Sequence, residues 1–564
     1  MKRIFILFLC GAALFACKKE DQNGGGGGGN EPQLPISVVG TVKGDDGTLL
    51  EGLVVSDGLV CVKTDASGHY ELPADLTKAM YVWVSTPSGY AAPVEKGQAV
   101  FYKKIADCSK DSGGRSVADF TLKKISNPNK FTIFIYADPQ PRKNSRGDTD
   151  QLAYKSLECC EDMYDDMQEL KASITDQPVY GIGLGDIVHQ DISLLDNHKT
   201  GMQRTGISNY NIIGNHDQCN NQTSANYEQS DDESWKLFAE KLGPVNYSFN
   251  LGNLHFLMLD NMISQGPGSG KWPDQECFTG FTEDIWKFIQ NDLATVATDK
   301  TIMVCAHSPM MHYISDGSVK ERGGRYIDQL RGLLKRYPKA YVWAGHSHST
   351  FNKADTDPIE THTLTRVTGA LWSNEYLGSN GTPRGYLVFK YDNGTVSWKF
   401  KPIFYQRGAH QKGVADDNDL YAYRDWNYVD AVVNGNNTRQ AKKKSDGVML
   451  DDSYQMQVFK PGTYSTDDEY LRVNVFMWDE NWKTPRFNGT TMKRSASGNQ
   501  NSRMYSYSEH KQTKYYYDKA PSFYSKVEDD NCFSMFHTHV EAHGSGEVTV
   551  EDPFGNTYSA TITW

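Results

Sequence analysis

Five short segments between Tyr136 and His348 each place metal-ligand side chains directly after an apolar stretch. The apolar stretches are 131–136, 179–184, 210–213, 301–305 and 340–344, and their length and composition predict β-strands. The segments that follow them are Asp138-Pro139-Gln140, Gly185-Asp186, Gly214-Asn215-His216-Asp217, Ala306-His307 and Gly345-His346-Ser347-His348. This repetition predicts one cluster of ligands at the carboxyl ends of strands in an α/β sheet.

The donors in these segments are the kinds that divalent cations bind. Carboxylate, carboxamide and imidazole groups suit borderline cations, and two ions about 3.5–4 Å apart need a carboxylate that bridges them. One Asp after a strand would mean little, but five ordered segments predict a two-metal hydrolase. A serine hydrolase is disfavoured, because the residues around Ser347 lack the final glycine of a G-x-S-x-G turn.

In this order, the segments resemble those of the calcineurin-like metallophosphoesterases, whose pattern is D-x-H, G-D, G-N-H-D/E, a lone H, and G-H-x-H. The resemblance covers residues 128–405 and departs at Gln140, where His is usual. An Asp-Pro-Gln variant occurs in a branch of that family. The resemblance implies an α/β fold, a metallophosphoesterase two-sheet sandwich flanked by helices, with β-rich domains before and after it.

The resemblance also implies a role for each ligand. Asp186 bridges two divalent ions, for which Mn, Mg, Zn and Fe are the candidates. One ion is completed by Asp138, Gln140 and His348, and the other by Asn215, His307 and His346. Gln140 offers a neutral carbonyl oxygen, which shifts its site toward Mg²⁺ or Mn²⁺. His189 is the alternative ligand, because the related purple acid phosphatases place a metal-binding Tyr three residues after the bridging Asp; a substrate-facing or surface position is favoured for it.

The function implied by the resemblance is hydrolysis of phosphomonoesters by attack of a metal-bridging hydroxide. His216 then acts as the general acid, and Asp217 holds its ring. Arg142 and Trp372 are candidate contacts to a phosphorylated small molecule or glycan, although either could be plain loop surface. Two alternatives remain open: a phosphodiesterase acting on nucleotides or phospholipid-type headgroups, and a noncatalytic surface binding lipoprotein.

The first residues resemble a bacterial lipoprotein signal. A basic start and a short apolar stretch lead to Cys17, so we expect residues 1–16 to be removed and Cys17 to carry lipid. The apolar stretch falls short of the about 20 residues that a transmembrane helix needs. Residues 17–35 include six consecutive glycines and predict a flexible tether. The acidic residues after Cys17 favour a surface-exposed outer-membrane location, with a periplasm-facing one as the alternative.

Two further β-rich domains are predicted. Residues 36–124 alternate apolar and polar residues between turn signals, which predicts a β-sandwich that resembles the carboxypeptidase-regulatory, transthyretin-like modules. Residues 410–564 resemble the C-terminal domain of a bacterial subgroup of calcineurin-like proteins. There, Trp478 and Trp482 are expected to pack in a core or between domains, with a sugar-stacking surface as the alternative.

Charge and the remaining motifs complete the sequence-based picture. The net charge of −12 argues against binding to a nucleic-acid polymer. Isolated histidines such as His255, His312 and His362 are expected to be satisfied core or surface residues. Asn393-Gly394 predicts a hairpin turn that closes the catalytic sheet. Long loops that choose the substrate are expected at 141–178, 189–209, 262–280, 312–325 and 371–384.

Overall fold

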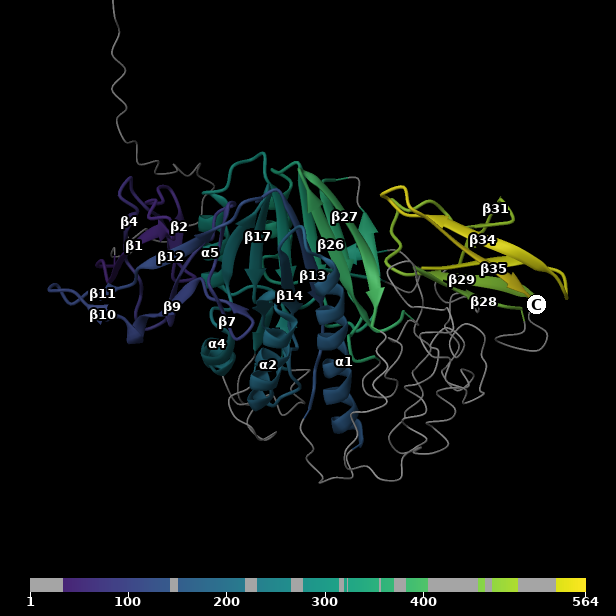
Figure 1. Ribbon diagram of the computed structural model, residues 1–564, viewed down its shortest axis with the longest axis horizontal. Coiled ribbons are helices and arrows are strands. Elements are labelled where there is room, and N and C mark those ends of the chain that lie inside the picture. Colours follow the sequence, from purple (N-terminus) through teal and green to yellow (C-terminus); the bar gives the residue numbers. More distant parts are fainter. Residues whose placement is uncertain are drawn as a thin grey trace, which may run out of the picture.

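The structure is a computed structural model that describes residues 34–142, 151–218, 231–264, 277–313, 319–321, 323–354, 357–369, 382–403, 455–461, 469–495 and 534–564. Cys17 and Trp372, for which roles were predicted, lie outside these residues. A β-rich N-terminal part, a central α/β part and a β-rich C-terminal part follow one another along the long axis (Figure 1). Among the described residues, no helix combines the length and apolar character needed to cross a membrane.

The first central sheet carries three of the five predicted segments. Strands β13 (Lys130–Tyr136), β14 (Val179–Leu184) and β15 (Ser208–Ile212) are parallel neighbours in the order β27-β26-β13-β14-β15-β8-β7. The antiparallel strands β26 (Gly385–Asp392) and β27 (Thr395–Pro402) close one side. Asn393 and Gly394 both have positive φ, 48° and 92°, as a two-residue hairpin turn requires, and the predicted hairpin is therefore confirmed.

The side chains of β13 alternate between two hydrophobic cores, as the pleat of a strand dictates. Phe131 and Ile133 belong to the core shared with the second central sheet. Phe134 and Tyr136 belong to the core that packs against helices on the opposite face. Because both faces of β13 are buried, its sequence is a continuous apolar run rather than an alternating one.

Two helices cover the outer face of this sheet, in regions for which loops were predicted. Helix α1 (Gln151–Ser173) lies within 141–178, and helix α2 (Leu195–Thr205) lies within 189–209, so these two loop predictions were wrong. In α1, the buried residues Cys160, Met163, Tyr164 and Met167 follow the i, i+3, i+4, i+7 spacing of one helix face. That periodicity was present in the sequence and identifies the helix.

The second central sheet carries the other two segments. Its order is β16-β17-β20-β23-β25-β24, and β17, β20, β23 and β25 run parallel. The strands are β16 (Tyr247–Leu251), β17 (Leu254–Leu259), β20 (Thr301–Ala306), β23 (Lys339–Ala344), β24 (Phe351–Ala354) and β25 (Ile359–Thr363). Helices α5 (Glu283–Leu293) and α6 (Ile327–Leu334) add apolar side chains to the same core. Two mixed sheets flanked by helices thus make up the central part, which confirms the predicted fold class.

The N-terminal part contains two sheets and also extends the first central sheet. Its sheets have the orders β10-β11-β1-β12-β6, with β4 beside β1, and β3-β2-β5-β9. Their strands are β1 (Val38–Gly44), β2 (Val54–Ser56), β3 (Cys61–Lys63), β4 (His69–Leu72), β5 (Tyr81–Val84), β6 (Tyr90–Ala91), β9 (Tyr102–Lys104), β10 (Ser109–Lys110), β11 (Ser116–Val117) and β12 (Phe120–Lys124). Two short strands of the same region, β7 (Val94–Glu95) and β8 (Gln98–Ala99), instead lengthen the sheet of β13. Backbone pairing therefore joins the N-terminal part to the central part.

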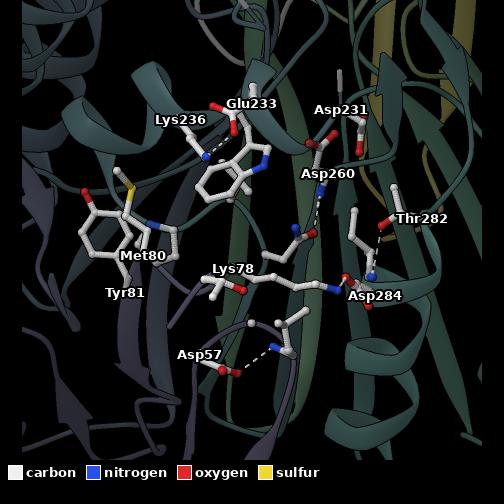
Figure 2. A pocket seen from close by; sticks show the side chains of 18 residues that line it. Asp57, Lys78, Met80, Tyr81, Asp231, Glu233, Lys236, Asp260, Thr282 and Asp284 are labelled. Atoms are coloured by element: carbon white, nitrogen blue, oxygen red, sulfur yellow. Dashed lines mark hydrogen bonds and ion pairs between the residues drawn. The ribbon is translucent and has the colours of Figure 1, made fainter. Parts of the chain in front are cut away.

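A cavity of about 350 Å³ lies where the N-terminal and central parts meet. Figure 2 shows Lys78 of the N-terminal part reaching across it to Asp284, at a distance of 2.6 Å. Asp57 lies at its edge and accepts hydrogen bonds from the backbone N–H groups of Leu59 and Val60. Short helices α3 (Asp231–Ser234) and α4 (Lys236–Leu242) contribute to its wall.

The described residues of the C-terminal part form two four-stranded sheets, with orders β28-β29-β33-β32 and β31-β30-β34-β35. The strands are β28 (Met456–Phe459), β29 (Tyr470–Val475), β30 (Arg486–Phe487), β31 (Thr490–Thr491), β32 (Lys493–Arg494), β33 (Met535–His539), β34 (Ser545–Glu551) and β35 (Thr557–Thr563). Trp478 and Trp482 lie in the core between them and are 8% and 7% exposed. Their indole faces are thus used in packing, as expected, and are closed to a sugar.

Candidate metal centre

The predicted ligand segments converge at the carboxyl ends of the parallel strands of both sheets. The backbone N–H of Asp138, after β13, donates to the carbonyl of Gly185, after β14. The backbone N–H of Gly345, after β23, donates to the carbonyl of His307, after β20. Asp138 itself accepts from the backbone N–H of His346 at 3.0–3.1 Å, which links the two sheets.

One group of potential ligands consists of Asp138, Asp186 and His348, all buried. The Nε2 atom of His348 lies 3.4 Å from Oδ1 of Asp138 and makes no hydrogen bond. Gln140 lies beside this group, and its amide nitrogen donates to Oδ2 of Asp186. The Oε1 atom of Gln140 is buried without a hydrogen-bond partner. Leaving buried polar atoms without partners costs free energy, and a cation bound by both atoms would offset that cost.

A second group consists of Asp186, His307 and His346, so Asp186 is common to both groups. His307 Nε2 lies 3.2 Å from Asp186 Oδ1 and also 3.2 Å from Asn215 Oδ1. His346 Nδ1 lies 2.9 Å from the same Asn215 oxygen. The opposite nitrogen of the His307 ring, Nδ1, faces the carbonyl oxygen of Leu184 at 2.7 Å, which fixes Nε2 as the nitrogen available to a metal.

The backbone of this centre is held in an uncommon conformation. Five of the potential ligands have positive φ, between 41° and 65°: Asp138, Gln140, Asp186, His346 and His348. Residues other than glycine adopt this left-handed region rarely, at a cost of order 1–3 kcal/mol each. Such strain persists only where the surrounding structure enforces it, and here it turns successive side chains toward one point.

Glycines next to the ligands make room for this convergence. A Cβ atom at Gly214 would lie 2.3 Å from Oδ1 of Asp186, and one at Gly345 would lie 2.3 Å from Oδ2 of Asp138. Neither neighbour can withdraw, because each carboxylate is enclosed by the strand ends. The G-D, G-N-H-D and G-H-x-H patterns therefore need glycine at these places for steric reasons.

The electrostatics of the centre are those of a cation site. Burial raises the pKa of Asp186, but the neighbouring His307, His216 and His346 outweigh it and bring the pKa below its usual range. Burial lowers the pKa of His307, but Asp186 and Asp138 outweigh it and raise the pKa to about 9. A proton on His307 thus competes with a metal ion for Nε2, so metal binding here releases a proton.

His216 lies at the edge of the centre and is tied to it through its backbone. Its N–H donates to Oδ1 of Asp186 at 2.8 Å. Its ring nitrogen Nδ1 lies 3.3 Å from the amide nitrogen of Gln190. The carboxylate of Asp217 accepts from the backbone N–H groups of Ile187, Val188 and Gly214, at 2.9–3.1 Å. Asp217 thus holds the loops on both sides of the centre, and its role toward the His216 ring stays a prediction.

Burial and the negative charge of Asp186 raise the pKa of Asp217 to about 8, while its hydrogen bonds with Val188, Gly214 and Ile187 act in the opposite direction. The same hydrogen bonds keep the backbone on either side of Asp186 and His216 in register. Asp217 is therefore a positioning residue for the centre.

His189, the alternative ligand, packs against His216. The two ring centroids are 4.3 Å apart, and His189 belongs to neither group of potential ligands. Burial, with the charges of His216 and Arg366, lowers the pKa of His189 to about 2, so this ring is neutral. Arg142 is half-buried, and its backbone N–H donates to Ser156. Its charge contributes to the lowered pKa of His189, which places it near this edge of the centre.

Two residues that support the centre were not identified from the sequence. Gln190, with φ of 61°, follows the Asp186 segment and faces His216. Arg366 is completely buried and donates to the carbonyl oxygens of Asp138 and Gln140 at 3.3 and 3.5 Å. Both contact residues of the centre that are distant in sequence, so no local spacing marks them.

Parts of this chain are similar to known proteins. Residues 36–125 match a family model described as the N-terminal of calcineurin-like phosphoesterase, nearly the range for which a transthyretin-like module was predicted. No curated protein matches this chain. A solved dimetal phosphatase of Danio rerio is 14% identical, with a TM-score of 0.33, over 48% of this chain and 95% of that one.

Two further solved structures cover a similar share of this chain. A purple acid phosphatase of yellow lupin is 17% identical, with a TM-score of 0.32, over 48% of this chain and 51% of that one. A 5′-nucleotidase precursor of Thermus thermophilus is 10% identical, with a TM-score of 0.26, over 48% of this chain and 54% of that one. At these identities and scores, the function is argued from the site itself.

Proposed function

We propose that this chain is a phosphoesterase with a dinuclear metal centre that hydrolyses phosphomonoesters of small molecules. The observation that carries the proposal is that one buried carboxylate, Asp186, belongs to two groups of potential ligands at once. A centre for a single ion does not need a shared carboxylate, whereas two ions close together do. The family model matched by residues 36–125 supports the same class.

The residues present fit two divalent ions. Asp138, Gln140 and His348 would complete one site with Asp186, and Asn215, His307 and His346 would complete the other. The unpartnered Oε1 of Gln140 and Nε2 of His348 are the atoms that a cation would satisfy. When bound, two such ions neutralise the phosphate oxygens and lower the pKa of water that attacks the phosphorus.

The protein itself supplies proton transfer to the leaving group. The amide nitrogen of Gln190 faces Nδ1 of His216, and we assign to Nε2 the proton that passes to the departing alkoxide. His216 reaches this position because its backbone N–H is fixed to Asp186 and because Asp217 holds the loops on both sides. His189 packs on the same ring and limits its rotation.

Two measurements test this proposal. Purified full-length protein should hydrolyse p-nitrophenyl phosphate faster than bis-p-nitrophenyl phosphate, and chelation followed by Mn²⁺, Zn²⁺ or Mg²⁺ should abolish and then restore the activity. Faster cleavage of the diester would instead assign a phosphodiesterase. Full metal occupancy with neither ester cleaved would contradict the proposal and favour a binding role.

A further inference from the structure

A second cluster of metal-binding side chains lies away from this centre, where the second central sheet meets the C-terminal part. It consists of Glu360 and His362 of β25 and Asp479, which follows β29. One ligand atom from each of the three lies within 4.8 Å of the others. All three side chains are buried: Glu360 is 6% exposed, His362 0% and Asp479 1%.

The sequence places Glu360 and His362 on one face of β25, because side chains two apart point the same way. His362 pairs across the sheet with Trp343 on one side and with Asn352 on the other. Its ring stacks on Trp343, with centroids 4.4 Å apart. Trp398 packs edge-to-face against the same imidazole at 5.1 Å and also contacts Trp343, at 5.5 Å, so the two indoles restrict rotation of the ring.

The tautomer of His362 leaves a lone pair facing those carboxylates. Nδ1 lies 3.1 Å from Oδ1 of Asn352, whose amide nitrogen in turn donates to the carbonyl oxygen of Trp478. An amide oxygen only accepts, so Nδ1 carries a hydrogen, and Nε2 is the ring nitrogen that faces the carboxylates and can bind a metal. Nε2 is buried and makes no hydrogen bond.

The distance between Nε2 of His362 and Oε2 of Glu360 is 3.6 Å, too long for a hydrogen bond. It is the separation expected of two atoms that share a metal ion, because ligands at about 2.0–2.2 Å from a tetrahedral ion lie about 3.3–3.6 Å apart. The other oxygen of Glu360 is already used, by Lys339 and by the amide nitrogen of Asn481 at 3.1 Å. Oε2 is thus the atom left for the cluster.

We propose that Glu360, His362 and Asp479 bind a divalent transition-metal ion that fastens the C-terminal part to the catalytic sheet. Two carboxylates and one imidazole suit Zn²⁺ or Mn²⁺. The ion would connect β25, which carries Glu360 and His362, with the turn after β29, which carries Asp479 and lies far away in the sequence. Neighbouring contacts connect the same two parts of the fold: Glu480 accepts hydrogen bonds from Lys353 and from the backbone N–H of Ala354, both at 3.0 Å.

The role is structural, because the three ligands are enclosed by protein and Trp343 and Trp398 wall the site. Loss of the ion leaves Glu360 and Asp479 close together in a buried space, with Lys339 as a cationic partner of Glu360. We therefore expect lower thermal stability on metal removal, and a loosened C-terminal part, rather than a direct loss of chemistry.

The test counts metals in the full chain. His362→Gln and Asp479→Asn should each lower the Zn or Mn content by one equivalent per chain, measured by plasma mass spectrometry, and should lower the Tm. The matched control is His255→Gln: His255 is also buried beside a carboxylate, but both its nitrogens have partners, Asn250 and Asp292, at 2.9 and 2.7 Å. This control should leave the metal content unchanged.

The outcome is independent of what the catalytic centre holds, because the comparison is between wild type and variant. Asp186→Asn, introduced into wild type and into each variant alike, changes the contribution of that centre equally in both members of each comparison, and the one-equivalent difference should persist. Anomalous diffraction from wild-type crystals grown with Zn²⁺ or Mn²⁺ should place an ion between Glu360, His362 and Asp479. Equal metal content in wild type and His362→Gln, with no anomalous peak, would overturn the proposal and assign His362 as a protonated ion-pair partner.

Discussion

The Nε2 atom of His307 lies 3.2 Å from Oδ1 of Asp186, and both side chains are almost completely buried. They come from strands of different sheets, β20 and β14, so their contact joins the two halves of the central fold. The carboxylate also contacts Gln140 and the backbone of His216. Asp186 thus contacts residues that follow three different strands. Replacing its charged carboxylate with a neutral group should therefore disturb more of the centre than the same change at another ligand.

We expect Asp186→Asn to abolish metal pairing and activity together. An amide of the same size keeps the shape but cannot offset the repulsion between two cations. Metal analysis should find at most one tightly held ion in this centre, apart from the ion at the cluster of Glu360, His362 and Asp479, and turnover of p-nitrophenyl phosphate should fall to background. An unchanged metal content with near-wild-type turnover would show that Asp186 is not the bridge.

Much of this centre could be predicted from the sequence because its signals are local. Each ligand lies one to four residues after a buried strand, and a buried strand leaves a continuous apolar run. The same reasoning could not find Arg366, which reaches the backbone of Asp138 and Gln140 from a distant segment. Side-chain-to-backbone contacts between separate segments leave no spacing in the sequence.

His255 and His362 also show that a single histidine in the sequence does not reveal its partners in the fold. Both were expected to be satisfied residues, and His255 is, with partners on both ring nitrogens. His362 shares a cluster with Asp479, which comes from another part of the fold. A lone histidine carries no information about a carboxylate that tertiary structure brings to it.

Gln140→His should leave the fold intact and raise the affinity of one site for Zn²⁺ or Mn²⁺. Imidazole is a stronger ligand than a neutral amide oxygen for these ions, and the Oε1 atom it replaces has no partner to lose. Titration of the metal-free protein, followed by calorimetry, measures the change. An unchanged titration would mean that Gln140 is not a ligand.

Stability should fall in acid because of His198, a buried residue of α2 that contacts only uncharged groups. Its ring nitrogens face the hydroxyls of Tyr136 and Tyr164, at 3.2 and 3.0 Å, and the side-chain oxygen of Asn211 at 3.3 Å. Burial lowers its pKa to about 4. The unfolded chain, with a pKa near 6.5, therefore binds more protons between these values, and stability is lost as the pH falls.

The expected loss from this one residue is about 2 kcal/mol between pH 7.5 and pH 5. Urea unfolding of wild type and His198→Gln at both pH values measures it, and the variant should lose about 2 kcal/mol less than wild type over this range. His539→Gln is the matched control, since His539 is exposed at the surface beside Glu469. An equal pH dependence in wild type and His198→Gln would contradict a neutral, buried His198.

Gln190→Glu should alter the pH dependence of catalysis through His216. A carboxylate placed 3.3 Å from Nδ1 stabilises the imidazolium form, so the proton is retained at higher pH. The basic limb of the rate profile for an alkyl phosphate should move upward, while metal content stays that of wild type. Gln190→Ala is the control, which removes the contact without adding charge. Identical profiles for wild type and Gln190→Glu would show that this contact does not govern proton transfer.

His216→Ala should separate substrates by their leaving groups. An alkyl alkoxide needs a proton as its bond breaks, whereas nitrophenolate largely does not, and a general acid contributes about 10²–10⁴-fold. The variant should therefore slow an alkyl phosphate by about that factor and p-nitrophenyl phosphate far less, with metal content preserved. Side-by-side kcat measurements on the two esters decide this. If both substrates lost activity equally, His216 would instead stabilise charge on the phosphoryl oxygens, as its place next to the shared carboxylate of Asp186 would also permit.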